Sequence, residues 1–285
     1  MKIAIASGKG GTGKTFVSTN IAKAISKAGR SVTLTDCDAE EPNDAAFFDA
    51  MPQKHIVVDH QIPAIDPERC TWCGRCAEWC EFHAILMVPN LKFSQVLTDI
   101  CHGCGACSMA CRDGAITTSP KKLGTITISQ RDNLTLVEGL TEIGAMSPVP
   151  VIKAALNNSR HHHWLTLLDA PPGTACAFAV TAGYADYTIL VTEPTPFGLS
   201  DLENSVEALR DLKKPFGVIV NRAGLGDRAL YDYLEKEKIA LLLEIPFNRL
   251  YALDYSNGRC AVDDDPALGK KLIAVVDKIV DTTWK

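Results

Sequence analysis

The stretch Gly8-Lys9-Gly10-Gly11-Thr12-Gly13-Lys14-Thr15 decides the fold of this 285-residue chain. It satisfies the phosphate-loop pattern G-x-x-x-x-G-K-[ST], in which the backbone N–H groups of a glycine-rich turn surround phosphate oxygens. An apolar run at 2–6 precedes it, and an amphipathic segment that ends at Gly29 follows it. A strand before the loop and a helix after it are the context in which this pattern binds nucleotides. The sequence therefore predicts a nucleotide site formed by all eight residues.

Two side chains of this loop have predictable roles. Lys14 is expected to reach the β- and γ-phosphates, and the Thr15 hydroxyl is expected to ligate Mg²⁺. The alternative is a glycine-rich turn with a solvent-exposed lysine. That alternative does not explain why a strand pattern precedes the turn and a helix pattern follows it.

The rest of the chain alternates between strand and helix patterns. Such alternation predicts an α/β fold with a mostly parallel sheet flanked by helices. The expected strands lie at 2–6, 31–36, 165–169, 187–192, 216–221 and 239–244, and the expected later helices lie at 199–212, 228–238 and 266–280.

The alternation fails between residues 60 and 120, where eight of the 11 cysteines fall. The stretch from Asp38 to Asp169 is also far too long for a single crossover between neighbouring strands. We therefore expect one nucleotide-binding domain, formed by 1–59 and 121–285, that is interrupted by a small module at 60–120.

The eight cysteines follow the spacing C-x₂-C-x₂-C-x₃-C twice. This doubled spacing is that of bacterial two-cluster ferredoxins, in which each fourth cysteine ligates the other cluster. The spacing predicts an α+β ferredoxin-like module with two [4Fe–4S] clusters. Zinc sites and disulfides are the alternatives, but zinc sites usually contain two CxxC pairs. The expected ligand sets are Cys70, Cys73, Cys76 and Cys111 for one cluster, and Cys101, Cys104, Cys107 and Cys80 for the other.

Composition excludes several classes of function. Apolar residues make up 46% of the chain, which is enough for a buried core, and the net charge is −5. This charge gives no basic surface for nucleic acid or anionic lipid, so neither is an expected partner. No run approaches the length of a membrane span. We expect a cytoplasmic protein in a reducing, low-potential or anaerobic setting, since so many cysteines without a disulfide pattern indicate metal binding.

The second lysine of the loop, Lys9, gives it a resemblance to the deviant Walker A loop of the MinD/ParA family. That family includes the nitrogenase iron protein and scaffold ATPases of iron–sulfur assembly. The resemblance implies ATP as the nucleotide and an ATP-dependent homodimer in which Lys9 reaches the partner's nucleotide. ATP rather than GTP rests on this resemblance alone.

Three further segments look like motifs of the same family. The segment around Asp36 and Asp38 resembles its second motif, which implies that Asp38 orients or activates the attacking water and that Asp36 lies near the metal's water shell. Asp169 ends a strand as a Walker B acid does, which implies a water-mediated contact to Mg²⁺. Each of these acids could also be a simple strand-end cap. The segments at 218–222 and 245–247 resemble those that contact the adenine, which implies roles for Asn221, Arg222 and Pro246.

The whole chain looks like the MinD-type ATPases that contain an inserted ferredoxin domain. This resemblance implies an ATPase that couples dimerisation to electron transfer with an unidentified partner protein. An iron–sulfur carrier or assembly ATPase and a spatial organiser with structural clusters are the alternatives. Cys176, seven residues after Asp169, is expected to be a packed thiol, although a contact to a partner's cluster is the alternative. The run at 161–163 is expected to be a solvated turn.

Overall fold

The computed structural model describes residues 1–159 and 164–283 of the chain. The histidine run at 161–163, which we expected to be a solvated turn, lies outside the described residues. By its contacts, the chain forms two compact units. The first unit consists of Met1–Ile56, Ile126–Leu140 and Pro148–Lys285, and the second consists of Val57–Thr125 and Thr141–Ser147.

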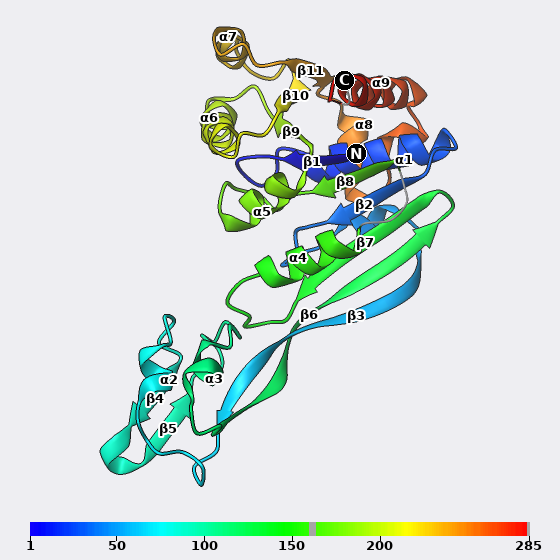
Figure 1. The fold of residues 1–285 in the computed structure, drawn as a ribbon. Helices are drawn as coiled ribbons and strands as arrows, with labels where there is room; N and C mark the ends of the chain where they lie inside the picture. The colour runs from blue at the N-terminus through cyan, green and yellow to red at the C-terminus, as the bar shows by residue number, and fades with distance from the viewer. Residues whose placement is uncertain (160–163, 284–285) are drawn as a thin grey trace. The chain divides into compact units, whose positions relative to one another are not determined.

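A nine-stranded sheet within the described residues has the strand order β11-β10-β9-β1-β8-β2-β7-β6-β3 (Figure 1). Neighbouring strands from β11 to β7 all pair in parallel. The prediction of an α/β fold with a mostly parallel sheet is confirmed. The strands are β1 (Lys2–Ala6), β2 (Val32–Asp36), β3 (Met51–Ile65), β6 (Ile116–Arg131), β7 (Leu134–Thr141), β8 (Leu165–Asp169), β9 (Tyr187–Thr192), β10 (Phe216–Ala223) and β11 (Leu241–Pro246).

Helices connect these strands and cover the sheet. Successive strand residues belong to two different hydrophobic clusters: Ile189 and Ile219 to one, Leu190 and Val218 to the other. Burial on both faces explains why the parallel strands are continuous apolar runs. The helices of this unit are α1 (Lys14–Lys27), α4 (Val149–Asn158), α5 (Cys176–Tyr184), α6 (Pro196–Asp211), α7 (Ala229–Lys236), α8 (Arg249–Ser256) and α9 (Pro266–Thr283), with 3₁₀ turns η1 (Asp44–Phe47) and η3 (Ala261–Asp263).

The second unit contains the cysteine motifs. Helices α2 and α3 contact each other, and β4 and β5 form an antiparallel hairpin. Its elements are α2 (Arg75–Glu78), β4 (Ile85–Val88), the 3₁₀ turn η2 (Pro89–Leu91), β5 (Phe93–Val96) and α3 (Ala106–Ala110).

Two differences from the predicted elements have physical reasons. The strand expected at 239–244 begins later, at Leu241, because the Ile239 amide still caps α7 by donating to the Leu234 carbonyl. The strand β7, which pairs in parallel with β2, was not predicted. It follows directly on the 16-residue strand β6, so no helix pattern precedes it to mark it as a strand of the alternating fold.

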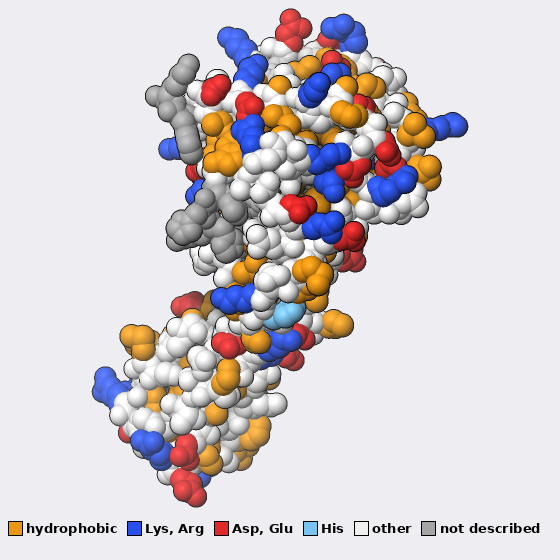
Figure 2. All heavy atoms as spheres, turned by 90° about the vertical axis from the view of Figure 1, so that its right-hand side faces the viewer, with side chains coloured by type: hydrophobic (Ala, Val, Ile, Leu, Met, Phe, Trp, Pro, Cys, Tyr) orange, Lys and Arg blue, Asp and Glu red, His pale blue; other side chains and the backbone are white. Residues whose placement is uncertain are grey.

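On the face drawn in Figure 2, basic and acidic side chains are interspersed over the molecule's surface. This mixture agrees with the modest net charge of −5. Among the described residues, no helix has both the length and the apolar composition needed to cross a bilayer.

Candidate functional site

The phosphate loop connects β1 to α1 at the carboxyl end of the sheet, where open α/β sheets bind ligands. Gly13 caps α1 with φ of 98°, in the left-handed region that favours glycine. A Cβ at Gly13 would collide with the side-chain amide of Asn221. That amide donates a hydrogen bond of 2.9 Å to the Thr12 carbonyl oxygen. The loop and the end of β10 therefore fix each other's position.

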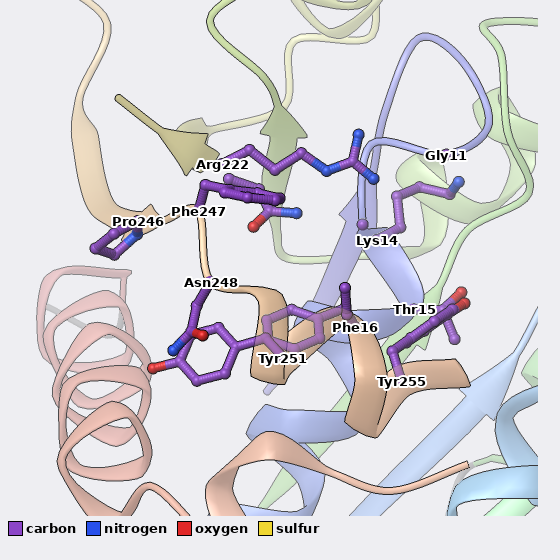
Figure 3. A pocket seen from close by; sticks show the side chains of 13 residues that line it. Gly11, Lys14, Thr15, Phe16, Arg222, Pro246, Phe247, Asn248, Tyr251 and Tyr255 are labelled. Carbon is purple, nitrogen blue, oxygen red and sulfur yellow. The ribbon is translucent and has the colours of Figure 1, made fainter. Parts of the chain in front are cut away.

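A cavity of about 270 Å³ opens beside this loop (Figure 3). Lys14, Thr15, Asn221, Arg222 and Pro246 are among the residues that line it. The structure thus brings four of the eight phosphate-loop residues, Gly11, Gly13, Lys14 and Thr15, to the same cavity as the three residues expected near the base, whereas Gly8, Lys9, Gly10 and Thr12 do not line it. A cavity of this kind, mostly apolar with a few polar groups, is typical of a small-molecule site.

Four aromatic residues line this cavity, and the sequence analysis missed three of them, because only Phe247 lies in a segment, 245–247, that was expected near the base. Phe16, Phe247, Tyr251 and Tyr255 all line it. The rings of Phe16 and Tyr251 lie 5.8 Å apart between centroids. The spacing of the two tyrosines, four residues apart on α8, is the signal that could have placed both on one helix face.

The predicted acids meet at the ends of β2 and β8. Asp36 and Asp169 are register partners on these two strands, and both are buried. Asp36 accepts hydrogen bonds from the backbone amides of Asp38, Asn43 and Asp44 over 2.8–3.1 Å. Burial and the nearby charge of Asp169 raise the pKa of Asp36, whereas burial raises the pKa of Asp169 against the opposing effect of Lys14.

Among the described residues, the buried Oδ1 of Asp169 has no hydrogen-bond partner. An orphaned carboxylate oxygen beside Lys14 and Thr15 fits a cation that also contacts phosphate, which is how Mg²⁺ is bound through one or two carboxylates. Within residues 1–159 and 164–283, no group of three His, Cys, Asp or Glu residues is arranged around a single metal ion. A Mg²⁺ site here would therefore depend on the nucleotide.

Asp38 and Asp44 follow the same strand. Asp38 is half-buried, and burial raises the pKa of its carboxyl while Lys14 lowers it. Asp44 was not predicted, but it is fully buried, and within the part of the chain that the structure describes neither of its carboxylate oxygens has a hydrogen-bond partner. Burial is the first cause that raises the Asp44 pKa, followed by the charges of Asp36 and Asp169.

Lys9 lies among acidic partners that the sequence analysis did not identify. Its Nζ is 3.5 Å from Glu193 Oε1 and 3.6 Å from Asp201 Oδ2. Arg222 NH1 is 2.7 Å from the other oxygen of Glu193. In this single chain, Lys9 is therefore held by the segment that follows β9 and by the first turns of α6, and its Nζ is not free.

Two smaller cavities in the second unit are lined by cysteines. Each receives three cysteines from one motif and the fourth from the other, and no member of the eight is in a disulfide. One cavity is lined by Cys70, Cys73, Cys76 and Cys111, and the other by Cys80, Cys101, Cys104 and Cys107.

Four backbone amides point at cysteine sulfurs in these cavities. Trp72 donates to Cys70 and Gly103 donates to Cys101, each over 3.4 Å. Similar amides of Ala84 and Ala115 donate to Cys80 and Cys111 over 3.2 and 3.3 Å. Four thiols per cavity with N–H donors aimed at sulfur are a donor set that suits an iron–sulfur cubane, which is larger than a single ion.

The three remaining cysteines do not enter these cavities. Cys37 and Cys260 are buried, and burial raises the pKa of both thiols. Cys176 is exposed at the start of α5, so the expectation of a packed thiol is wrong for this chain. The segment that precedes it packs too little against the sheet to cover the sulfur.

Comparisons with known proteins identify the family. The model of the CobQ/CobB/MinD/ParA nucleotide binding domain matches residues 3–260. The chain belongs to this family. An uncharacterised protein of Methanocaldococcus jannaschii is 32% identical over 229 residues, which are 80% of both chains.

Other matches are shorter or more distant. The septum site-determining protein MinD of Pyrococcus horikoshii, solved with Mg-ADP, has a TM-score of 0.60 at 20% identity, with 99% of this chain and 98% of that chain covered. This likeness shows the fold. An iron–sulfur cluster carrier protein of Saccharolobus solfataricus is 52% identical over 67 residues, which are 23% of each chain.

Proposed function

We propose that this protein is a Mg²⁺-dependent ATPase that dimerises with ATP bound and couples its nucleotide cycle to electron transfer through two [4Fe–4S] clusters. The observation that carries the proposal is the presence of two four-cysteine cavities in a chain that also has a phosphate-loop cavity. The Mg-ADP bound by the MinD of Pyrococcus horikoshii supports an adenine nucleotide for this chain as well.

The residues of the nucleotide cavity suit hydrolysis by positioning and charge neutralisation. Lys14 would neutralise the β- and γ-phosphates, and the Lys9 of a second copy would add positive charge at the same phosphates. Thr15 and Asp169 would hold Mg²⁺, which neutralises phosphate charge when bound, with Asp36 near its water shell. Asp38 would accept a hydrogen bond from the water that attacks the γ-phosphorus, as ADP leaves. Arg222, Asn221 and Pro246 would contact the base.

The second unit is proposed to be the inserted ferredoxin-like module. Each set of four thiolates would hold one cluster, and each cluster supplies one-electron chemistry when bound. The N–H groups donated to Cys70, Cys80, Cys101 and Cys111 would stabilise the negative charge on those sulfurs. The remaining partner would be a separate electron-transfer protein.

A second candidate function is an iron–sulfur carrier or assembly ATPase. It is favoured by one observation, the 52% identity to the Saccharolobus solfataricus carrier over 67 residues. In that case the clusters are cargo. The cysteines that line each cavity come from both motifs. This arrangement favours clusters that the protein retains over clusters that it releases.

The two functions differ in how ATP acts on the clusters. The chain would be purified anaerobically, reduced with dithionite and mixed with ferric cytochrome c as an artificial acceptor. We expect Mg-ATP to change the reoxidation rate several-fold relative to Mg-ADP, and Lys14→Ala to abolish that difference. Transfer of iron and sulfide to an apo-ferredoxin within minutes would instead support the carrier, and equal rates with both nucleotides would contradict the coupling.

A further inference from the structure

The two cysteine motifs are structural repeats, so each residue of the first has a counterpart 31 positions later. Their backbones match in detail. Trp72 and its counterpart Gly103 have φ of 57° and 63°, and Gly74 and Gly105 have φ of 79° and 78°. Matched backbones make the side-chain differences between the two halves directly comparable.

The backbone donors to sulfur also match. In each half one amide donates to the first cysteine over 3.4 Å and one donates to the fourth over 3.2–3.3 Å. Each cavity takes three cysteines from one motif and its fourth from the other, so each cavity has one amide that donates to a first cysteine and one that donates to a fourth. The backbone therefore stabilises the two sets of thiolates about equally. Any difference between the two clusters must come from side chains.

The clearest side-chain difference is at Arg75. Its guanidinium Nε donates a hydrogen bond of 3.4 Å to Cys73 Sγ, and Arg75 lines the cavity of the Cys70 set. Its counterpart is Ala106, which has no donor for Cys104. One cluster site therefore has a cation bonded directly to a ligand sulfur, and the matched position of the other site is a methyl group.

The residues that follow the fourth cysteines act in the same direction, because Cys111 of the first set is followed by Arg112, whereas Cys80 of the second set is followed by Glu81. Two groups that line the cavities oppose it. They are His102, whose imidazole lines the second cavity, and Asp113, which lines the first. The Oδ2 of Asp113 accepts a hydrogen bond of 2.8 Å from Thr71, which offsets part of its charge.

We infer that Arg75 gives the two clusters different reduction potentials, with the cluster held by the Cys70 set at the higher potential. The inference rests on the proposed function, in which both cavities hold [4Fe–4S] clusters. Reduction adds one electron to a cluster, and a nearby cation with a hydrogen bond to sulfur favours the more negative form. An electron from a one-electron donor such as dithionite therefore resides on the Arg75 side, and the other cluster is reduced second.

The test is a redox titration of the anaerobically reconstituted chain with dithionite, followed by electron paramagnetic resonance. The native chain should show two separate midpoint potentials. Arg75→Ala should lower the higher midpoint potential. The equilibrium constant for reduction of that cluster should fall about tenfold, which corresponds to 59 mV for a one-electron couple. The lower midpoint should not move.

The mirror variant Ala106→Arg provides a matched comparison in the other half. It should raise the lower midpoint and leave the upper one unchanged, and it tests the inference even if Arg75→Ala assembles poorly. Equal midpoints in the native chain, or midpoints that neither variant moves, would overturn the inference. Iron and sulfide analysis of the same samples separates this result from failure of the proposed function, because a chain with zinc and no sulfide overturns both.

Discussion

The side-chain amide of Asn221 donates a hydrogen bond of 2.9 Å to the carbonyl oxygen of Thr12, which connects the end of β10 to the phosphate loop. The same amide occupies the space that a Cβ at Gly13 would need. The loop conformation therefore depends on a residue more than two hundred positions away, and this residue also lines the nucleotide cavity.

Replacing Asn221 with alanine should weaken nucleotide binding. The Thr12 carbonyl loses its partner, and a hydrogen bond of this kind contributes about 0.5–1.5 kcal/mol, so we expect the Kd for Mg-ATP to rise about tenfold. Isothermal titration calorimetry measures this. Asn158→Ala is the matched control, because that amide donates to the Ala154 carbonyl of its own helix. An unchanged Kd in Asn221→Ala would show that the contact does not shape the site.

Replacing Lys9 should separate nucleotide binding from dimerisation. Lys9 lies at 3.5–3.6 Å from Glu193 and Asp201 within its own chain, so Lys9→Ala should leave ATP binding by the monomer nearly intact. We expect ATP-dependent dimers to disappear and phosphate release to fall about 10²-fold, as when one donor to transition-state charge is lost. Light scattering and phosphate release measure the two effects. The exposed Lys153 provides the control Lys153→Ala. Dimers formed by Lys9→Ala would contradict the proposed role.

Acidification should stabilise the nucleotide-free protein, because buried Asp36 has a pKa raised to about 8. Between the ordinary carboxyl range and pH 8, the folded state binds more protons than the unfolded state. The free energy of unfolding therefore falls as the pH rises through this window. Denaturant unfolding at several pH values measures the slope. Asp36→Asn should reduce the slope of the unfolding free energy against pH. Asp281→Asn, at an exposed position, should leave that slope unchanged. A slope of opposite sign would show that Asp36 is charged in the folded state.

Replacing one cysteine of either set should remove one cluster and leave the other in place. Cys70→Ser and Cys104→Ser each remove one ligand of a different set, so each should lose about half of the iron and sulfide. Cys176→Ser is the matched control, because Cys176 is exposed and lines neither cavity. Iron and sulfide assays on anaerobic samples measure the result. Loss of iron in Cys176→Ser would mean that this residue is itself a ligand.

The phosphate loop and the strand-end acids could be predicted from the sequence because local patterns determine both. A glycine-rich turn between a strand and a helix identifies the loop, and Asp36 and Asp169 each end an apolar run. Partners that come from distant segments could not be predicted. Glu193 and Asp201 meet Lys9 only because the topology brings β9 beside β1.

The same distinction applies to the remaining elements. Strand β7 follows the long strand β6 without a helix between them and was not predicted, although it extends the parallel sheet beside β2. The spacing, taken with the ferredoxin signature, predicts two sets of four cysteines, and the same sets line the two cavities. The spacing could not predict the proposed difference in reduction potential between the two sets, because that difference depends on the contact between Arg75 and Cys73.

The central claim is that one chain both hydrolyses ATP and holds two [4Fe–4S] clusters. The most direct test measures iron, sulfide, zinc and Mg-ATP hydrolysis in one anaerobically purified sample, with Lys14→Ala beside it. We predict about eight irons and eight sulfides per chain in both proteins, with hydrolysis in the native chain and none in Lys14→Ala. Zinc without sulfide, or equal hydrolysis by the two proteins, would contradict the claim.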